Sequence, residues 1–120
     1  MITIKSKSRE FTKVEEYLMT IAPSIVSMKD VPDDTVIAVN GVLIFEDTKD
    51  DDPENISEIL SIITPDNIVY SCQSATFKRS LNDILNMMDG AKFSIKKISG
   101  KTKNGRDYIN CVLDINSVES

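Results

Sequence analysis

The residues best suited to chemistry are cations that gather near the end of the chain. Six of them fall within a window of 15 residues with no acidic residue before Asp107: Lys92, Lys96, Lys97, Lys101, Lys103 and Arg106. Cationic side chains neutralise phosphates and release counterions, which is the main source of affinity for nucleic acid. Lysines on a hairpin also keep an exposed sheet edge soluble, so this window alone leaves both roles open.

Three of the seven aromatic residues are candidates for stacking on nucleic-acid bases. Stacking contributes roughly 1–3 kcal/mol per base and works with any base. Tyr70 and Tyr108 fit this role because a tyrosine can keep its hydroxyl in water while its ring lies on a surface. Phe45 closes an apolar run beside an acidic segment. Each of the three could equally belong to the edge of the core.

The composition excludes several classes of enzyme. The chain has no histidine, so Ser-His-Asp and Cys-His catalytic arrangements and most zinc and non-haem iron sites are absent. Its four glycines form no phosphate-binding loop. Cys72 and Cys111 each lie in an apolar run and are expected to be buried free thiols. The sequence therefore predicts a non-enzymatic protein without a metal site or a cofactor.

The charge is unevenly distributed along the 120 residues, which carry a net charge of −5. Residues 1–73 have a net charge of −8, whereas residues 74–120 have a net charge of +3. The length fits one domain. No apolar stretch approaches the roughly 18 residues that span a bilayer, and no signal-like block follows Met1. We therefore expect a soluble, cytoplasmic protein that contacts no membrane.

The first 26 residues are expected to form an N-terminal extension made of a strand and a short helix. Residues 2–5 alternate between apolar and polar, as in a strand. Thr12 and Glu15 have the spacing of a capping box, and Pro23 ends the helix that follows. This extension is either an accessory element on the main fold or an oligomerisation arm.

Residues 27–120 are expected to form the main domain, a mainly β structure. Gly41 indicates a bend in the first strand, Ser74 an N-cap, Gly90 a helix end and Asn104-Gly105 a hairpin turn. The acidic stretch 46–55 is expected to be a solvated loop. Five strands with a helix between strands 3 and 4 are typical of the OB-fold, a partly open five-stranded barrel. The expected strands are residues 35–45, 56–64, 68–72, 92–98 and 108–115.

Four segments, in order, carry a resemblance to a known family. They are Ser-Met-Lys-Asp-Val-Pro-Asp-Asp-Thr-Val-Ile at 27–37, Ile-Val-Tyr-Ser at 68–71, Ser-Leu-Asn-Asp-Ile-Leu at 80–85 and Phe-Ser-Ile-Lys-Lys-Ile-Ser-Gly-Lys-Thr-Lys-Asn-Gly-Arg-Asp-Tyr at 93–108. With them, residues 27–115 resemble the single-stranded-DNA-binding proteins of small phages that replicate linear genomes by protein priming.

The resemblance implies an OB-fold that coats exposed single strands during phage DNA replication, with little sequence preference. It implies single-stranded DNA and phage replication proteins as partners, in the cytoplasm of the host cell. It also places Phe45 and Tyr70 where the family has stacking aromatics, and Lys101, Lys103 and Arg106 in its basic final loop. Combined with the residue pattern, the predicted DNA-binding set is Phe45, Tyr70, Tyr108, Lys96, Lys101, Lys103 and Arg106.

A second hypothesis rests on the acidic stretch 46–55, which holds six acids and one lysine. In this view the chain is a protein-interaction module, OB-like or α+β, that docks a basic partner through that stretch. DNA binding would distinguish the two hypotheses. The sequence leaves the oligomeric state open.

Overall fold

A computed structural model describes residues 2–49 and 52–117, and the fold is mainly β. None of the described helices is long and apolar enough to cross a membrane. The described strands are β1 (Ile2–Lys7), β2 (Val26–Ser27), β3 (Val36–Val39), β4 (Gly41–Lys49), β5 (Asp52–Ile63), β6 (Val69–Cys72), β7 (Phe93–Lys101) and β8 (Asp107–Leu113). The helices are α1 (Lys13–Thr20), α2 (Ala75–Met88) and the short 3-10 turns η1 (Met28–Asp30) and η2 (Ile115–Ser117).

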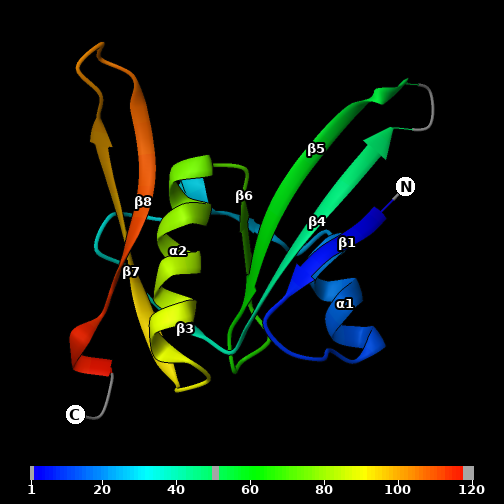
Figure 1. Cartoon of the computed structure of the whole chain (residues 1–120), viewed down its shortest axis with the longest axis horizontal. Helices are drawn as coiled ribbons and strands as arrows, with labels where there is room; N and C mark the ends of the chain where they lie inside the picture. Colours follow the sequence, from blue (N-terminus) through cyan, green and yellow to red (C-terminus); the bar gives the residue numbers. More distant parts are fainter. Residues whose placement is uncertain (1, 50–51, 118–120) are drawn as a thin grey trace.

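The strands form two sheets, and the chain passes directly from one to the other between β3 and β4 (Figure 1). The five-stranded sheet has the order β1-β4-β5-β6-β2, and the three-stranded sheet has the order β3-β7-β8. Only Asn40 separates β3 from β4, so the chain passes from one sheet to the other there. A Cβ at Gly41 would lie 2.5 Å from Cε1 of Phe11, which explains why a glycine follows the break. The predicted bend at Gly41 is confirmed.

The fold is mainly β as predicted, but its strands do not form the predicted five-stranded, partly open barrel. Within the described residues no ladder joins β6 to β8, so the two sheets do not close into a barrel. The edge of β6 is already occupied, because β2 pairs with it in parallel through Val26–Tyr70 and Ser27–Ser71. β8 packs instead against α2. The strand predicted at residues 2–5 is confirmed as β1, whereas the sequence pattern did not predict β2.

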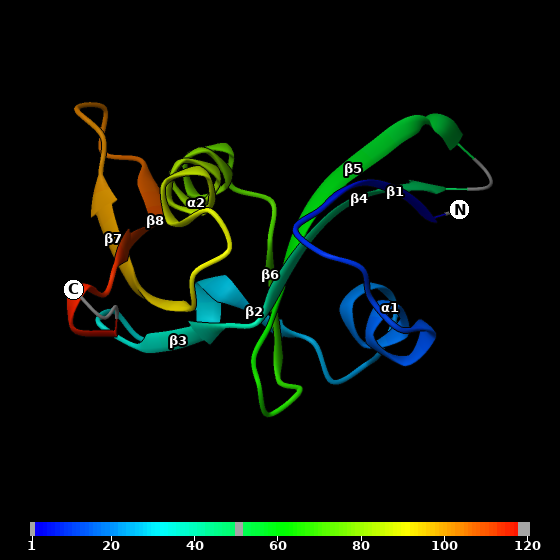
Figure 2. The ribbon, with the colours of Figure 1, turned by 60° about the horizontal axis from the view of Figure 1, so that its bottom comes forward.

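The core is divided between the two faces of the five-stranded sheet (Figure 2). One face packs with α2 and the three-stranded sheet around Phe77, Leu81 and Ile95. The other face lies under α1, where Met19 is fully buried beside Phe45. Since side chains alternate along a strand, adjacent residues of β4 enter different clusters. The two helices therefore lie on opposite sides of this sheet.

Both predicted helix starts and one predicted helix end are confirmed. The Glu15 amide donates to Thr12 Oγ1 at 3.1 Å, and the Thr12 amide donates to the Glu15 carboxylate at 2.9 Å. The Phe77 amide donates to Ser74 Oγ at 3.1 Å, which caps α2. Gly90, with a φ of 89°, follows its last turn.

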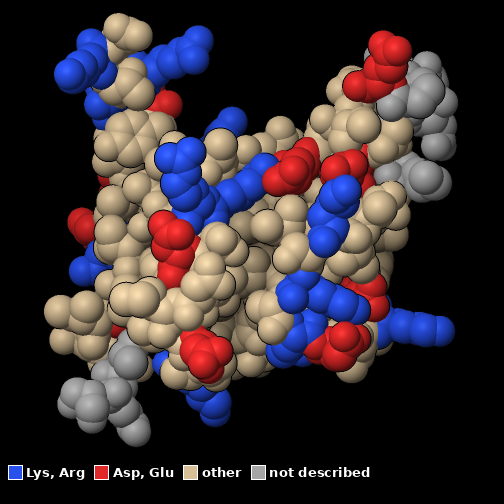
Figure 3. All heavy atoms as spheres, in the orientation of Figure 1, with Lys and Arg blue, Asp and Glu red and all other residues tan. Residues whose placement is uncertain are grey.

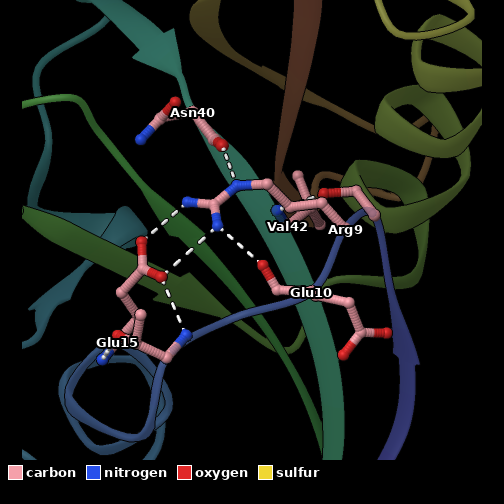
Figure 4. Close-up of polar contacts among 7 residues, drawn as sticks. Arg9, Glu10, Glu15, Asn40 and Val42 are labelled. Atoms are coloured by element: carbon pink, nitrogen blue, oxygen red, sulfur yellow. Dashed lines mark hydrogen bonds and ion pairs between the residues drawn. The ribbon is translucent and has the colours of Figure 1, made fainter.

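Arg9 ties the N-terminal segment to the bend between the sheets (Figure 4). Its Nε donates to the carbonyl of Asn40 at 2.8 Å, and its two terminal nitrogens contact the Glu15 carboxylate at 2.7 and 3.3 Å. These hydrogen bonds from Arg9, followed by the amide of Thr12, lower the pKa of Glu15 from 4.5 to about 2. β1 also pairs with β4. The division of the chain at residue 26 stays a prediction.

The acidic stretch 46–55 is largely β-structure, so the prediction of a solvated loop is wrong. β4 continues to Lys49 and β5 starts at Asp52, with Glu46 facing Glu58 across the ladder. The ladder tolerates this pair because each carboxylate has its own cation: Lys5 Nζ lies 3.4 Å from Glu46, and Lys78 Nζ lies 3.3 Å from Glu58. Residues 50–51 lie outside the described part of the chain.

Candidate nucleic-acid interface

The β7–β8 hairpin carries most of the predicted cations at its tip. The two strands pair from Ile95–Leu113 to Lys101–Asp107. The Gly105 amide then donates to the carbonyl of Thr102 at 2.9 Å, and Gly105 has a φ of 80°. The predicted Asn104-Gly105 turn is therefore confirmed. It leaves three cations exposed together at the tip, which Figure 3 shows as one basic group: Lys101, Lys103 and Arg106.

Tyr108 lies directly below this tip, with its ring supported by the neighbouring strand. It faces Gly100 across the ladder, and a Cβ at Gly100 would lie 2.6 Å from the Tyr108 hydroxyl. The absence of a side chain at Gly100 therefore lets the ring lie against the backbone. Tyr108 remains 37% exposed. A ring held by backbone on one side and open to solvent on the other is suited to stacking.

An open cleft of about 880 Å³ lies beside the hairpin. Its far wall comes from η1 and from the link between β6 and α2, which contribute Lys29 and Gln73. A hydrogen bond of 3.3 Å from Ser74 Oγ to the carbonyl of Ile109 joins the two walls. We call this hollow the hairpin cleft. It is lined by Lys29, Gln73, Ser74, Lys97, Ser99, Gly100, Lys101, Asp107, Tyr108 and Ile109.

Lys97 lines the hairpin cleft but is engaged in holding the fold. It is 4% exposed, and its Nζ donates to the carbonyl of Val31 at 2.7 Å and lies 3.3 Å from Asp33. Ser99 Oγ donates to the other oxygen of Asp33 at 2.6 Å. The hydrogen bonds from Ser99 and then from Lys97 lower the pKa of Asp33. The charge of Lys97 is therefore already neutralised by the protein.

Lys96 does not lie with the other predicted cations. Its neighbours in the ladder are Val36 and Val112, which are 50% and 42% exposed. Since side chains alternate along β7, Lys96 lies on the face opposite to Lys97 and Lys101. That outer face of the three-stranded sheet turns away from the hairpin cleft. The Tyr108 ring lies on the same outer face, at its hairpin end, because Tyr108 pairs with Gly100.

The structure places the other two predicted aromatics away from the hairpin. Phe45 is 2% exposed and packs with Met19 and Leu43 under α1, so its ring is not accessible to a base. Tyr70 is half-buried against the main core, with Ile62 as its partner in the ladder. The burial of Phe45 could not be predicted from the sequence, because α1 covers that side of the sheet only in the folded chain.

A second hollow, of about 580 Å³, lies between α2 and the β1–β4 edge. Three of its basic residues are held in ion pairs: Lys7 with Glu10 at 3.1 Å, Arg9 with Glu15 at 2.7 Å and Lys78 with Glu58 at 3.3 Å. Their charges are therefore compensated within the protein. Lys92 lines this hollow without an ion pair among the described residues, as Lys29 does in the hairpin cleft. The hairpin cleft differs in lying beside the exposed cations of the β7–β8 tip.

The described residues include no group of three or more His, Cys, Asp or Glu side chains that could hold a metal ion. Both cysteines are free and buried, as expected from the sequence. Burial raises the pKa of Cys111 to about 12, and it also raises the pKa of Cys72. Both thiols therefore stay protonated at neutral pH.

Comparison with known proteins identifies a family for this chain. A family model described as "Phage Single-stranded DNA-binding protein" matches residues 3–114, which is nearly the whole chain. No curated protein and no solved structure matches the chain significantly.

Proposed function

The chain belongs to the family of phage single-stranded DNA-binding proteins, and from this premise we propose that it coats exposed single strands during phage DNA replication. In this proposal it binds with little sequence preference and without enzymatic activity, in the host cytoplasm, alongside other phage replication proteins. The observation that carries the proposal is the tip of the β7–β8 hairpin. Three exposed cations there lie beyond a tyrosine whose ring is both supported and accessible.

We interpret the fold as an open variant of the OB-fold. This interpretation counts β3 and β4 as one bent strand, followed by β5 and β6 before α2 and by β7 and β8 after it, and it is supported by the pairing of β3 with β7. In this interpretation residues 27–120 form the DNA-binding domain and residues 1–26 an extension. β2 occupies the edge of β6 at which the barrel would otherwise close.

The proposed contacts are a subset of those predicted from the sequence. Bases stack on Tyr108, and phosphates contact the cations of the tip, Lys101, Lys103 and Arg106. Phe45 is left out because it is buried, and Lys96 because it lies on the outer face. Tyr70 is left out because its ring packs on the core.

The proposal is tested by titration with a thymine homopolymer and with a duplex of matched length. The chain has no tryptophan, so tyrosine emission reports stacking directly. We expect quenching by the single strand alone. Tyr108→Ala should weaken binding by roughly 5- to 150-fold, equivalent to about 1–3 kcal/mol for one stacked base.

Tyr17→Ala is the matched control, since Tyr17 is also exposed but lies on α1. This variant should bind as the wild type does. Equal quenching by the duplex, or no change in mobility with DNA at low salt, would overturn the proposal. The acidic stretch 46–55 would then be tested for a basic protein partner.

A further inference from the structure

The hairpin cleft has two walls that come from distant parts of the chain. The hairpin wall presents Ser99 and Lys101 from one face of β7, and the opposite wall presents Lys29 and Gln73. Lys29 is exposed on η1 and makes no ion pair with any residue that the structure describes. Its charge is therefore available to a ligand in the cleft.

We propose that the single strand lies in the hairpin cleft, with Lys29 and Lys101 contacting its phosphates from opposite walls. This inference rests on the proposed function and adds the path of the strand. Lys97 cannot take that role because Asp33 and the Val31 carbonyl already hold its ammonium group. Lys101 has only a 3.7 Å contact to Asp107, and both side chains are well exposed. Such a surface pair is weak and can open to a phosphate.

The lining of the cleft matches the chemistry of a nucleotide. The half-buried Ile109 offers an apolar surface to the flat face of a base, while Gln73 and Ser99 offer polar groups to its edge. A strand in this position would run between the hairpin and the start of α2. It would reach the outer face of the three-stranded sheet only at the hairpin tip, where the Tyr108 ring lies over Gly100, and not at Lys96 between Val36 and Val112.

Two variants with the same change of charge separate these paths. Lys29→Ala should weaken binding of a thymine homopolymer by about 2- to 5-fold at low salt, the range of one exposed ion pair. It should also make the slope of log K against log salt shallower by about 0.7, as expected for one lost phosphate contact on a single strand. Lys96→Ala should bind as the wild type does.

A second readout needs no variant. Lysines of the wild-type protein are acetylated with and without the thymine homopolymer and are then quantified by mass spectrometry. We expect DNA to protect Lys29 and Lys101. Lys96 and Lys13, which lie away from the cleft, should be modified equally in both samples.

The outcomes distinguish failure of the path from failure of the function. If the wild type binds but Lys29→Ala binds equally well and Lys29 is not protected, the strand does not use the far wall and the inference is wrong. A loss of affinity in Lys96→Ala would place the strand along the outer face between Val36 and Val112, and the inference would again be wrong. A wild type that does not bind single strands would instead overturn the proposed function itself. Unchanged urea midpoints would show that both variants fold.

Discussion

Neighbouring lysines of one strand have very different environments, and this decides what each can do. Lys96 faces solvent on the outer face, whereas Lys97 is buried and holds the turn that contains Val31 and Asp33. Lys101 is exposed at the tip of the hairpin. The same residue type therefore serves solubility, folding and proposed binding within six positions.

Lys97→Met should lower the free energy of unfolding by about 1–3 kcal/mol. The substitution keeps much of the volume but leaves the buried carbonyl of Val31 without its donor. Urea denaturation of the wild type and the variant measures the difference. Lys96→Met, with the same change on the exposed face, should unfold nearly as the wild type does. Equal midpoints for the two variants would contradict a structural role for Lys97.

At the scale of elements, the bend between β3 and β4 is held by contacts from the N-terminal segment. Arg9 bonds at once to the carbonyl of Asn40 and to Glu15 of α1. Its guanidinium also lies 4.4 Å from the centre of the Phe11 ring, which packs against Gly41. The first residues of the chain thus fix the point at which the two sheets diverge.

This arrangement predicts a dependence of stability on pH. The pKa of Glu15 is about 2 in the folded protein and 4.5 without these contacts, so the unfolded state takes up its proton first as the pH falls. The stabilisation by Glu15 is complete above about pH 4.5 and is lost as the pH falls toward 2. Urea midpoints of the wild type should decrease over that range.

The urea midpoint of Glu15→Gln should decrease less between pH 4.5 and 2 than that of the wild type. Asp33, whose pKa is also lowered, is a source of the decrease that remains. Glu16→Gln is the matched control, since Glu16 lies in the same turn of α1 without the Arg9 contact. It should keep the full pH dependence. The role of Glu15 would be refuted by parallel curves for Glu15→Gln and the wild type.

At the scale of the whole molecule, the two long hairpins carry opposite charge (Figure 3). The β7–β8 tip is basic, whereas acidic residues lie toward the end of the β4–β5 hairpin. Local field matters more than mean charge for steering a ligand, so a net charge of −5 does not prevent binding of DNA. Acidic side chains repel phosphates, so the charge distribution favours the proposed binding of single-stranded DNA beside β7 and β8 over binding at the β4–β5 hairpin.

The small number of exposed cations near the β7–β8 tip predicts that the affinity for single-stranded DNA depends moderately on salt concentration. With about 3–5 phosphates neutralised, log K against log salt should have a slope of roughly −2 to −3.5 for a single strand. Titrations of the thymine homopolymer at four or more salt concentrations measure this slope. An affinity that does not change with salt would rule out a phosphate-based mechanism.

The sequence by itself determined the local features of this protein. The capping box at Thr12, the cap at Ser74 and the Asn104-Gly105 turn each depend on residues within a few positions of one another. The clustering of Lys101, Lys103 and Arg106 follows from that turn. Local backbone chemistry is enough to predict such features.

Only the tertiary structure decided which of these residues can meet a ligand. Phe45 is buried because α1 folds over it, and Lys97 is buried because the turn around Asp33 closes on β7. Lys29 comes to face the hairpin only when β2 and η1 reach the edge of β6. These outcomes depend on packing between segments far apart in the chain, so they cannot be predicted from the pattern of neighbouring residues.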